Sequence, residues 1–84
     1  MKENLNLELI IKKFNEIFID ILDEEDIVLE YATTADDIED WDSLTNIQLI
    51  VAIEKHFKIK FKAIEIDTYQ NVGEMCEGVL QKIS

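Results

Sequence analysis

The sequence predicts an all-α fold, a small bundle of three main antiparallel helices and one short helix. Three observations favour this fold. Apolar residues recur at helical spacing in three separate stretches. The chain has no proline and only two glycines, so residues that interrupt helices are scarce. Hydrophobic residues make up 48% of the chain, which argues against disorder despite the high charge. A length of 84 residues is enough for one domain, residues 1–84.

The first helix is predicted from about Asn4 or Leu5 to Leu22. Asn4 is a candidate N-cap, because its side-chain oxygen can accept hydrogen bonds from the free N–H groups of the first turn. The apolar residues recur every three or four positions, which predicts that they face the core. They are Leu7, Ile10, Ile11, Phe14, Ile17, Phe18, Ile21 and Leu22.

A long acidic loop, Asp23 to Asp42, follows with ten acids and no base. Loops of this length are usually functional or partly structured, and we expect one helical turn from Thr34 or Ala35 to Ile38. The acids do not form an EF-hand, since counting from Asp36 places Trp41 and Gln48 where that motif needs Gly and Glu. We therefore expect no metal site. The apolar residues expected to anchor the loop are Ile27, Val28, Leu29, Tyr31, Ile38 and Trp41.

The central helix is predicted from Ser43 to His56 or Phe57. At 100° per residue, its apolar residues form two adjoining arcs. Leu49, Ile50, Ile53 and Phe57 form one arc, and Leu44, Ile47 and Val51 form the other. Two interpretations follow: either the helix is central and largely buried, or the first arc packs into the core while the second lies at a partner surface near Ser43.

The remaining elements are an extended connector at residues 58–62, a short third helix at residues 63–67 and a last helix that begins after Asn71. Asn71 and Glu74 match the spacing of a capping box. The apolar stripe of this helix consists of Val72, Met75, Cys76, Val79, Leu80 and Ile83. Cys76 falls within the stripe, which predicts a small core residue rather than a nucleophile.

The junction of the acidic loop and the central helix reads Asp42-Ser43-Leu44. Either Asp42 or Ser43 can serve as the N-cap, and an isolated Asp-Ser pair needs no other explanation. The only histidine, His56, lies thirteen residues after Ser43 on the same helix, so the two cannot meet as nucleophile and base. The sequence therefore predicts no enzyme active site, and Ser43 is better interpreted as the substrate of another enzyme.

This triplet, the helix pattern after it, the chain length and the acidity together resemble the acyl carrier proteins, from about Leu7 to the end of the chain. The resemblance implies a small acyl-carrier-like bundle in which Ser43 carries a 4′-phosphopantetheine arm, with Asp42 and Leu44 completing the attachment motif. The arm comes from coenzyme A through a phosphopantetheinyl transferase, and its thiol holds an acyl group as a thioester. The short third helix would border the pocket that shelters the acyl chain.

The same resemblance implies docking to acyl-loading and acyl-transferring enzymes with basic patches. The net charge of −11 fits such partners and should repel nucleic acid and anionic lipid. Trp41 has two interpretations, a loop anchor or a contact beside the arm. The predicted partner surface consists of Asp36, Asp37, Asp40, Trp41, Ile47 and Val51.

Two departures distinguish the chain from the fatty-acid carriers of this family. Their second helix is strongly acidic, whereas here the acids lie in the preceding loop, and Asp40 replaces a glycine found in many members. A specialised polyketide, aminoacyl, acyl-transfer or polysaccharide-modification pathway is therefore at least as well supported as fatty-acid synthesis. The competing hypothesis is an unmodified acidic interaction module in which Ser43 is only a cap. A peptidyl carrier is less favoured, because the glycines that usually precede its serine are missing.

Sequence features also bear on location and assembly. A single cysteine excludes an internal disulfide framework. No apolar run is long enough to span a bilayer, and the amino terminus lacks the features of a signal peptide. We expect a monomeric cytoplasmic protein.

Overall fold

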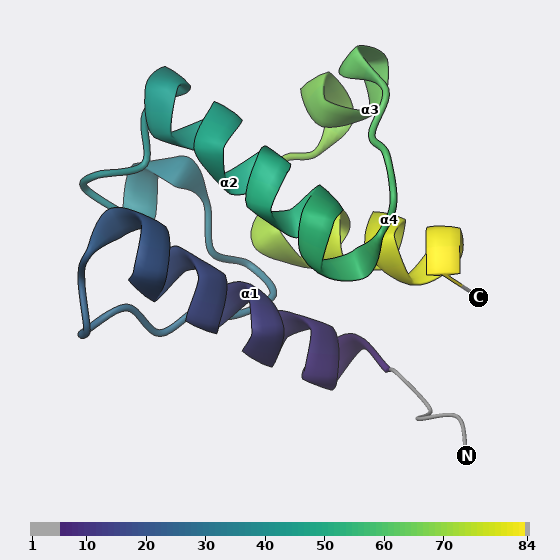
Figure 1. Cartoon of the computed structure of the whole chain (residues 1–84). Coiled ribbons are helices and arrows are strands. Elements are labelled where there is room, and N and C mark those ends of the chain that lie inside the picture. Colours follow the sequence, from purple (N-terminus) through teal and green to yellow (C-terminus); the bar gives the residue numbers. More distant parts are fainter. Residues whose placement is uncertain (1–5, 84) are drawn as a thin grey trace.

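The computed structural model describes residues 6–83. Its elements are α1 (Leu7–Leu22), a 3₁₀ turn η1 (Ala35–Asp37), α2 (Ser43–Phe57), α3 (Ala63–Thr68) and α4 (Val72–Ile83). Helix α1 packs against both α2 and α4 and runs in the opposite direction to them, while the short α3 lies at one side (Figure 1). No strand occurs in this part of the chain. The predicted all-α bundle is confirmed.

One core lies between the three long helices, and each contributes residues at helical spacing. Phe14 is at its centre, with ring centroids 6.4 Å from Phe18 and 6.2 Å from Phe57. Removal of these side chains from water is the main stabilising contribution to so small a domain. The fully buried side chains are Ile10, Phe14 and Phe18 of α1, Leu49 and Ile53 of α2, and Val72, Cys76 and Val79 of α4.

The start of α1 differs from the prediction. Asn6 caps the helix, because its Oδ1 accepts a hydrogen bond from the Leu9 N–H at 2.9 Å. Asn4 and Leu5, where the sequence analysis placed the start, lie outside the described residues. Two asparagines two positions apart satisfy the same capping preference, so spacing alone did not distinguish them.

The acidic loop is fastened to α1 by Asn15. Its Nδ2 donates to the Ile27 carbonyl at 3.1 Å, and its Oδ1 accepts from the Leu29 N–H at 2.6 Å. Ile27 and Leu29 are buried, but Val28 is 75% exposed, so its predicted anchoring role is wrong. Burial alternates along residues 27–30, as expected where successive side chains point in opposite directions.

The middle of this loop is attached to α4 through its backbone. The N–H groups of Val72 and Gly73 donate to the carbonyls of Thr33 and Tyr31, both at 2.8 Å. The Tyr31 ring lies where a methyl group on Gly73 would be, so this contact requires glycine. Tyr31 therefore anchors the loop although its side chain is 42% exposed.

Asn71 caps α4 as predicted, accepting from the Glu74 N–H at 2.8 Å. The reciprocal bond of the capping box is displaced by one residue, because the Glu74 carboxylate accepts from the N–H of Gln70. The predicted turn in the acidic loop is confirmed by η1. Residues 59–62 form a connector without helix or strand, whereas Lys58, which was predicted to be extended, is left-handed and caps the end of α2.

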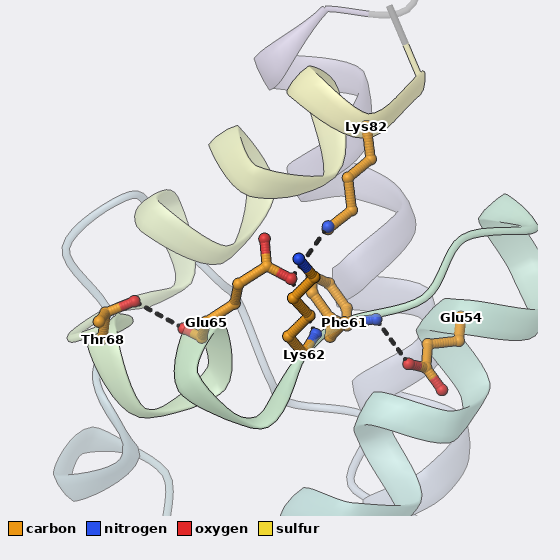
Figure 2. A network of polar contacts seen from close by, with 6 residues as sticks. All are labelled: Glu54, Phe61, Lys62, Glu65, Thr68 and Lys82. Atoms are coloured by element: carbon orange, nitrogen blue, oxygen red, sulfur yellow. Dashed lines mark hydrogen bonds and ion pairs between the residues drawn. The ribbon is translucent and has the colours of Figure 1, made fainter.

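Helix α3 has only six residues, too few to be stable alone, and polar contacts hold it to the bundle (Figure 2). The Glu65 carboxylate accepts from the Lys62 N–H at 2.8 Å and pairs with the Lys82 ammonium at 3.0 Å. Glu54 of α2 accepts from the Phe61 N–H at 2.8 Å. The Lys82 contact thus connects α3 to α4, and the Glu54 contact connects α2 to the segment that leads into α3.

Candidate functional site

Asp42 organises the start of α2. Its Oδ1 accepts hydrogen bonds from the N–H groups of Leu44 at 3.0 Å and Thr45 at 2.9 Å, while Thr45 Oγ1 accepts from the Asp42 N–H at 2.8 Å. The hydrogen bonds from Thr45 lower the pKa of the Asp42 carboxyl below its ordinary value. Of the two capping candidates in the sequence, Asp42 is therefore the N-cap, with its charge at the positive end of the helix dipole.

Ser43 is the first residue of α2, and its side chain is exposed. Among residues 6–83, no hydrogen-bond partner is found for its hydroxyl group. Because Asp42 supplies the cap, the Ser43 hydroxyl is not required by the helix. The fold thus presents this oxygen to solvent at a fixed position.

A cleft of about 370 Å³ opens beside Ser43, between the start of α2 and the α3–α4 segment. Trp41 lies on its α2 side, where the indole N–H donates to Asn46 Oδ1 at 2.9 Å. The Trp41 ring also packs against Phe18 in a T-shaped pair, with centroids 4.9 Å apart and planes at 89°. Trp41 therefore anchors the loop and also lines the cleft beside Ser43. The lining residues are Ala35, Trp41, Asp42, Ser43, Asn46, Ile66, Tyr69, Gln70, Asn71 and Met75.

Sequence reasoning placed residues 63–67 beside a pocket, but it did not identify the polar lining from Asn46, Gln70 and Asn71. Asn46 could have been identified from the sequence, because it falls on the core-facing arc of α2, where an amide side chain needs a polar partner. Gln70 and Asn71 precede α4 and reach the cleft only through the tertiary fold. Partial burial raises the pKa of the Tyr69 hydroxyl on this wall.

The residues of the predicted partner surface outside the cleft are exposed. Asp36 and Asp37 lie in η1, where Asp37 Oδ2 also accepts from the Thr34 N–H at 2.9 Å. The outer apolar arc of α2 is not in the core, since Leu44, Ile47 and Val51 are 68%, 63% and 43% exposed. The interpretation of α2 as a largely buried helix is therefore wrong. Asp40, at the end of the acidic loop, is exposed as well.

Residues 6–83 also bear on metal binding and on membrane insertion. This region has no group of three or more His, Cys, Asp and Glu side chains that could hold a metal ion. Nor does any of its helices have the length and apolar character required to cross a membrane. His56 is exposed near the end of α2 opposite Ser43, with its ring against Phe57.

Three comparisons with known proteins agree with this geometry. Residues 12–79 match the family described as "Phosphopantetheine attachment site". The solution structure of holo acyl carrier protein from Geobacter metallireducens superimposes with a TM-score of 0.82 and 40% identity, covering 87% of this chain and 84% of that one. The acyl carrier protein of Cyanidium caldarium is 40% identical over 43 residues, 51% of this chain. That match spans 50% of the length of the curated relative.

The fold and site thus define a small helical carrier. The chain belongs to the phosphopantetheine attachment-site family, to which it is matched over most of its length, and its relatives are acyl carrier proteins. The prosthetic group is 4′-phosphopantetheine.

Proposed function

We propose that Ser43 carries the 4′-phosphopantetheine arm and that residues 1–84 act as one carrier domain. The observation that supports this most strongly is the Ser43 hydroxyl, which is exposed, unneeded by the helix cap and placed beside the cleft. A transferase must reach its acceptor oxygen, and a serine used for capping would lose a stabilising bond on modification.

The residues around Ser43 fit such a group. The cleft begins at Ser43 and combines an apolar wall, Ile66 and Met75, with amide side chains. Asn46 and Asn71 each use the side-chain oxygen in a hydrogen bond, which leaves their NH₂ groups as donors. Such donors suit the amide carbonyls of a pantetheine arm. When bound, the arm supplies a thiol that holds an acyl group as a thioester.

The composition of the exposed face of α2 supports a role of this protein in a specialised pathway rather than in fatty-acid synthesis. None of the exposed residues of α2 is an acid, and the docking charges lie in the preceding loop. The partners proposed are therefore a phosphopantetheinyl transferase and enzymes that load and transfer an acyl group, with basic groups facing Asp36, Asp37 and Asp40. The apolar part of the surface is Leu44, Ile47 and Val51.

Intact mass after incubation with coenzyme A, magnesium and a broad-specificity phosphopantetheinyl transferase tests the attachment. We expect wild type to gain the mass of one phosphopantetheine and Ser43→Ala to gain none. Ser84→Ala is the matched control, because Ser84 is the only other serine in the chain. This control should be modified like wild type.

Two results would overturn the proposal in different ways. A wild-type protein left unmodified by several active transferases would favour the unmodified interaction module. Modification that persists in Ser43→Ala would keep the carrier function but refute the site. Acylation of the modified protein, followed by release with hydroxylamine, then tests whether the thiol carries a thioester.

A further inference from the structure

The basic residues of the chain are concentrated at the end of α2 far from Ser43. Four of the eight lysines lie within residues 55–62, which contain no acid. Lys55, Lys58 and Lys60 are exposed, and none of them forms an ion pair within residues 6–83. In a chain with a net charge of −11, this is a local reversal of sign.

These lysines line a surface groove together with two apolar residues, Val51 and Ile59. It is lined by Val51, Glu54, Lys55, Lys58, Ile59 and Lys60. Glu54 is its only acid, and that carboxylate accepts a hydrogen bond from the Phe61 N–H. Three lysines and one glutamate leave a formal charge of +2 in the groove.

The groove continues the exposed apolar arc of α2. Val51 belongs to both, and Lys55 follows it by four residues, so it lies one turn further along the same face. This face is therefore acidic before Ser43, apolar along Leu44, Ile47 and Val51, and basic beyond Val51. Figure 1 shows the two ends of α2 pointing to opposite sides of the bundle.

Lys58 has a backbone conformation that favours glycine. It is the C-cap residue of α2, with φ of 58°, and its N–H donates to the Glu54 carbonyl. Any side chain in this left-handed region is strained relative to glycine. The helix end therefore has no need of a lysine in particular, although a cation there is mildly favourable.

We propose that the groove binds an acidic patch on a partner enzyme, so that α2 docks in one orientation on a surface that is basic near Ser43 and acidic beyond Val51. This inference rests on the proposed carrier function. Two opposite charge contacts at the ends of an apolar face favour one docking direction and penalise the reverse, in which like charges meet.

The acidic and basic ends of the α2 face are far enough apart to be distinguished by the salt dependence of binding. Asp42 and Lys55 are thirteen residues apart in and beside α2, which is about 20 Å at 1.5 Å per residue. The screening length is about 8 Å in 0.15 M salt and about 30 Å in 0.01 M salt. In low salt an acidic ligand thus meets the repulsion of the whole chain, whereas near physiological salt it meets mainly the groove.

The experiment is an NMR titration of the ¹⁵N-labelled holo protein with two helical peptides, one of Leu and Glu and a matched one of Leu and Gln. The acidic peptide should shift the amide signals of Val51, Lys55, Lys58 and Lys60, and the Gln peptide should bind several-fold more weakly. Affinity for the acidic peptide should be higher at about 0.1 M salt than at about 0.01 M, and should fall again at about 0.5 M.

Charge variants test the location of the site. Lys58→Gly combined with Lys60→Gln should weaken binding of the acidic peptide about fivefold, as expected for two exposed charge contacts. Lys12→Gln with Lys13→Gln is the matched control, since it makes the same change of net charge on the exposed face of α1. The control should bind as wild type does, and circular dichroism confirms that each variant is folded.

Equal binding of both peptides, shifts confined to other residues, or no binding would each overturn the proposal. Binding to phosphatidylglycerol vesicles in place of the peptide would also overturn it and identify a lipid surface. The Ser43→Ala protein should bind the acidic peptide as wild type does, because the groove lies at the other end of α2. Failure of attachment at Ser43 and failure of the groove are therefore separate results.

Discussion

Replacing Ser43 by alanine should separate the stability of the fold from the function of the serine. The Ser43 side chain is exposed and Asp42 holds the cap, so the variant loses no hydrogen bond seen within residues 6–83. Alanine is also the better helix former. We expect the free energy of unfolding to change by less than about 0.5 kcal/mol, the range of ordinary surface substitutions.

Phe14→Ala is the contrasting variant. Phe14 is fully buried against Phe18 and Phe57, so its truncation opens a cavity and should cost about 3–5 kcal/mol. At about 0.05–0.15 kcal/mol per residue, an 84-residue domain has a stability of about 4–13 kcal/mol, and this variant loses a large share of it.

Urea titrations followed by circular dichroism measure both effects. With an m-value of about 1 kcal/mol per molar, Ser43→Ala should move the midpoint by less than about 0.5 M. Phe14→Ala should lower it by several times as much or leave the chain unfolded. If Ser43→Ala lost more than about 1 kcal/mol, the serine would have a structural role, and its loss of modification would no longer identify the attachment site.

Two further predictions follow from the titrating groups. The Asp42 pKa is lowered by folding, so its stabilising contribution is complete above the ordinary pKa of about 3.9 and is lost as pH falls through the lower folded value. The difference in unfolding free energy between wild type and Asp42→Asn, an equally good cap, should shrink below about pH 4; a difference that stays constant to full protonation would refute this. Burial raises the pKa of the Cys76 thiol to about 12, so the native apo protein should not react with a disulfide reagent at neutral pH, whereas denaturation should expose one thiol. The native holo protein should react once, through its arm, and rapid labelling of native apo protein would contradict the burial of Cys76.

The long helices could be predicted from sequence because each buries a stripe of apolar residues at helical spacing. This spacing does not depend on how the side chains pack in the core. The connector and the short third helix were predicted from residues 58–67, which lie between the apolar stripes of the central helix and the last helix. Val28 was misassigned because a hydrophobic residue in an extended segment faces the core or the solvent according to register, which composition does not reveal.

The site was predictable in part. Asp42-Ser43-Leu44 marks the junction, but the choice between two adjacent capping residues depends on backbone geometry that only the structure provides. The cleft was less accessible to sequence reasoning, since Asn46 and Gln70 are 24 positions apart and meet only through the fold. The acids before Ser43 and the lysines after Val51 are both visible in the sequence. Whether those lysines continue the exposed face of α2 depends on where residues 58–60 lie after the helix, which only the structure provides.

Trp41 has a consequence for how this protein can be observed. It is the only tryptophan in the chain, its indole N–H is held by Asn46, and its ring forms part of the cleft wall next to Ser43. Indole fluorescence responds to the water and the quenching groups around the ring. Trp41 is therefore an intrinsic fluorophore beside the serine. The entry of an arm or its cargo into the cleft can be followed in real time on unlabelled protein as a shift in the emission wavelength of Trp41.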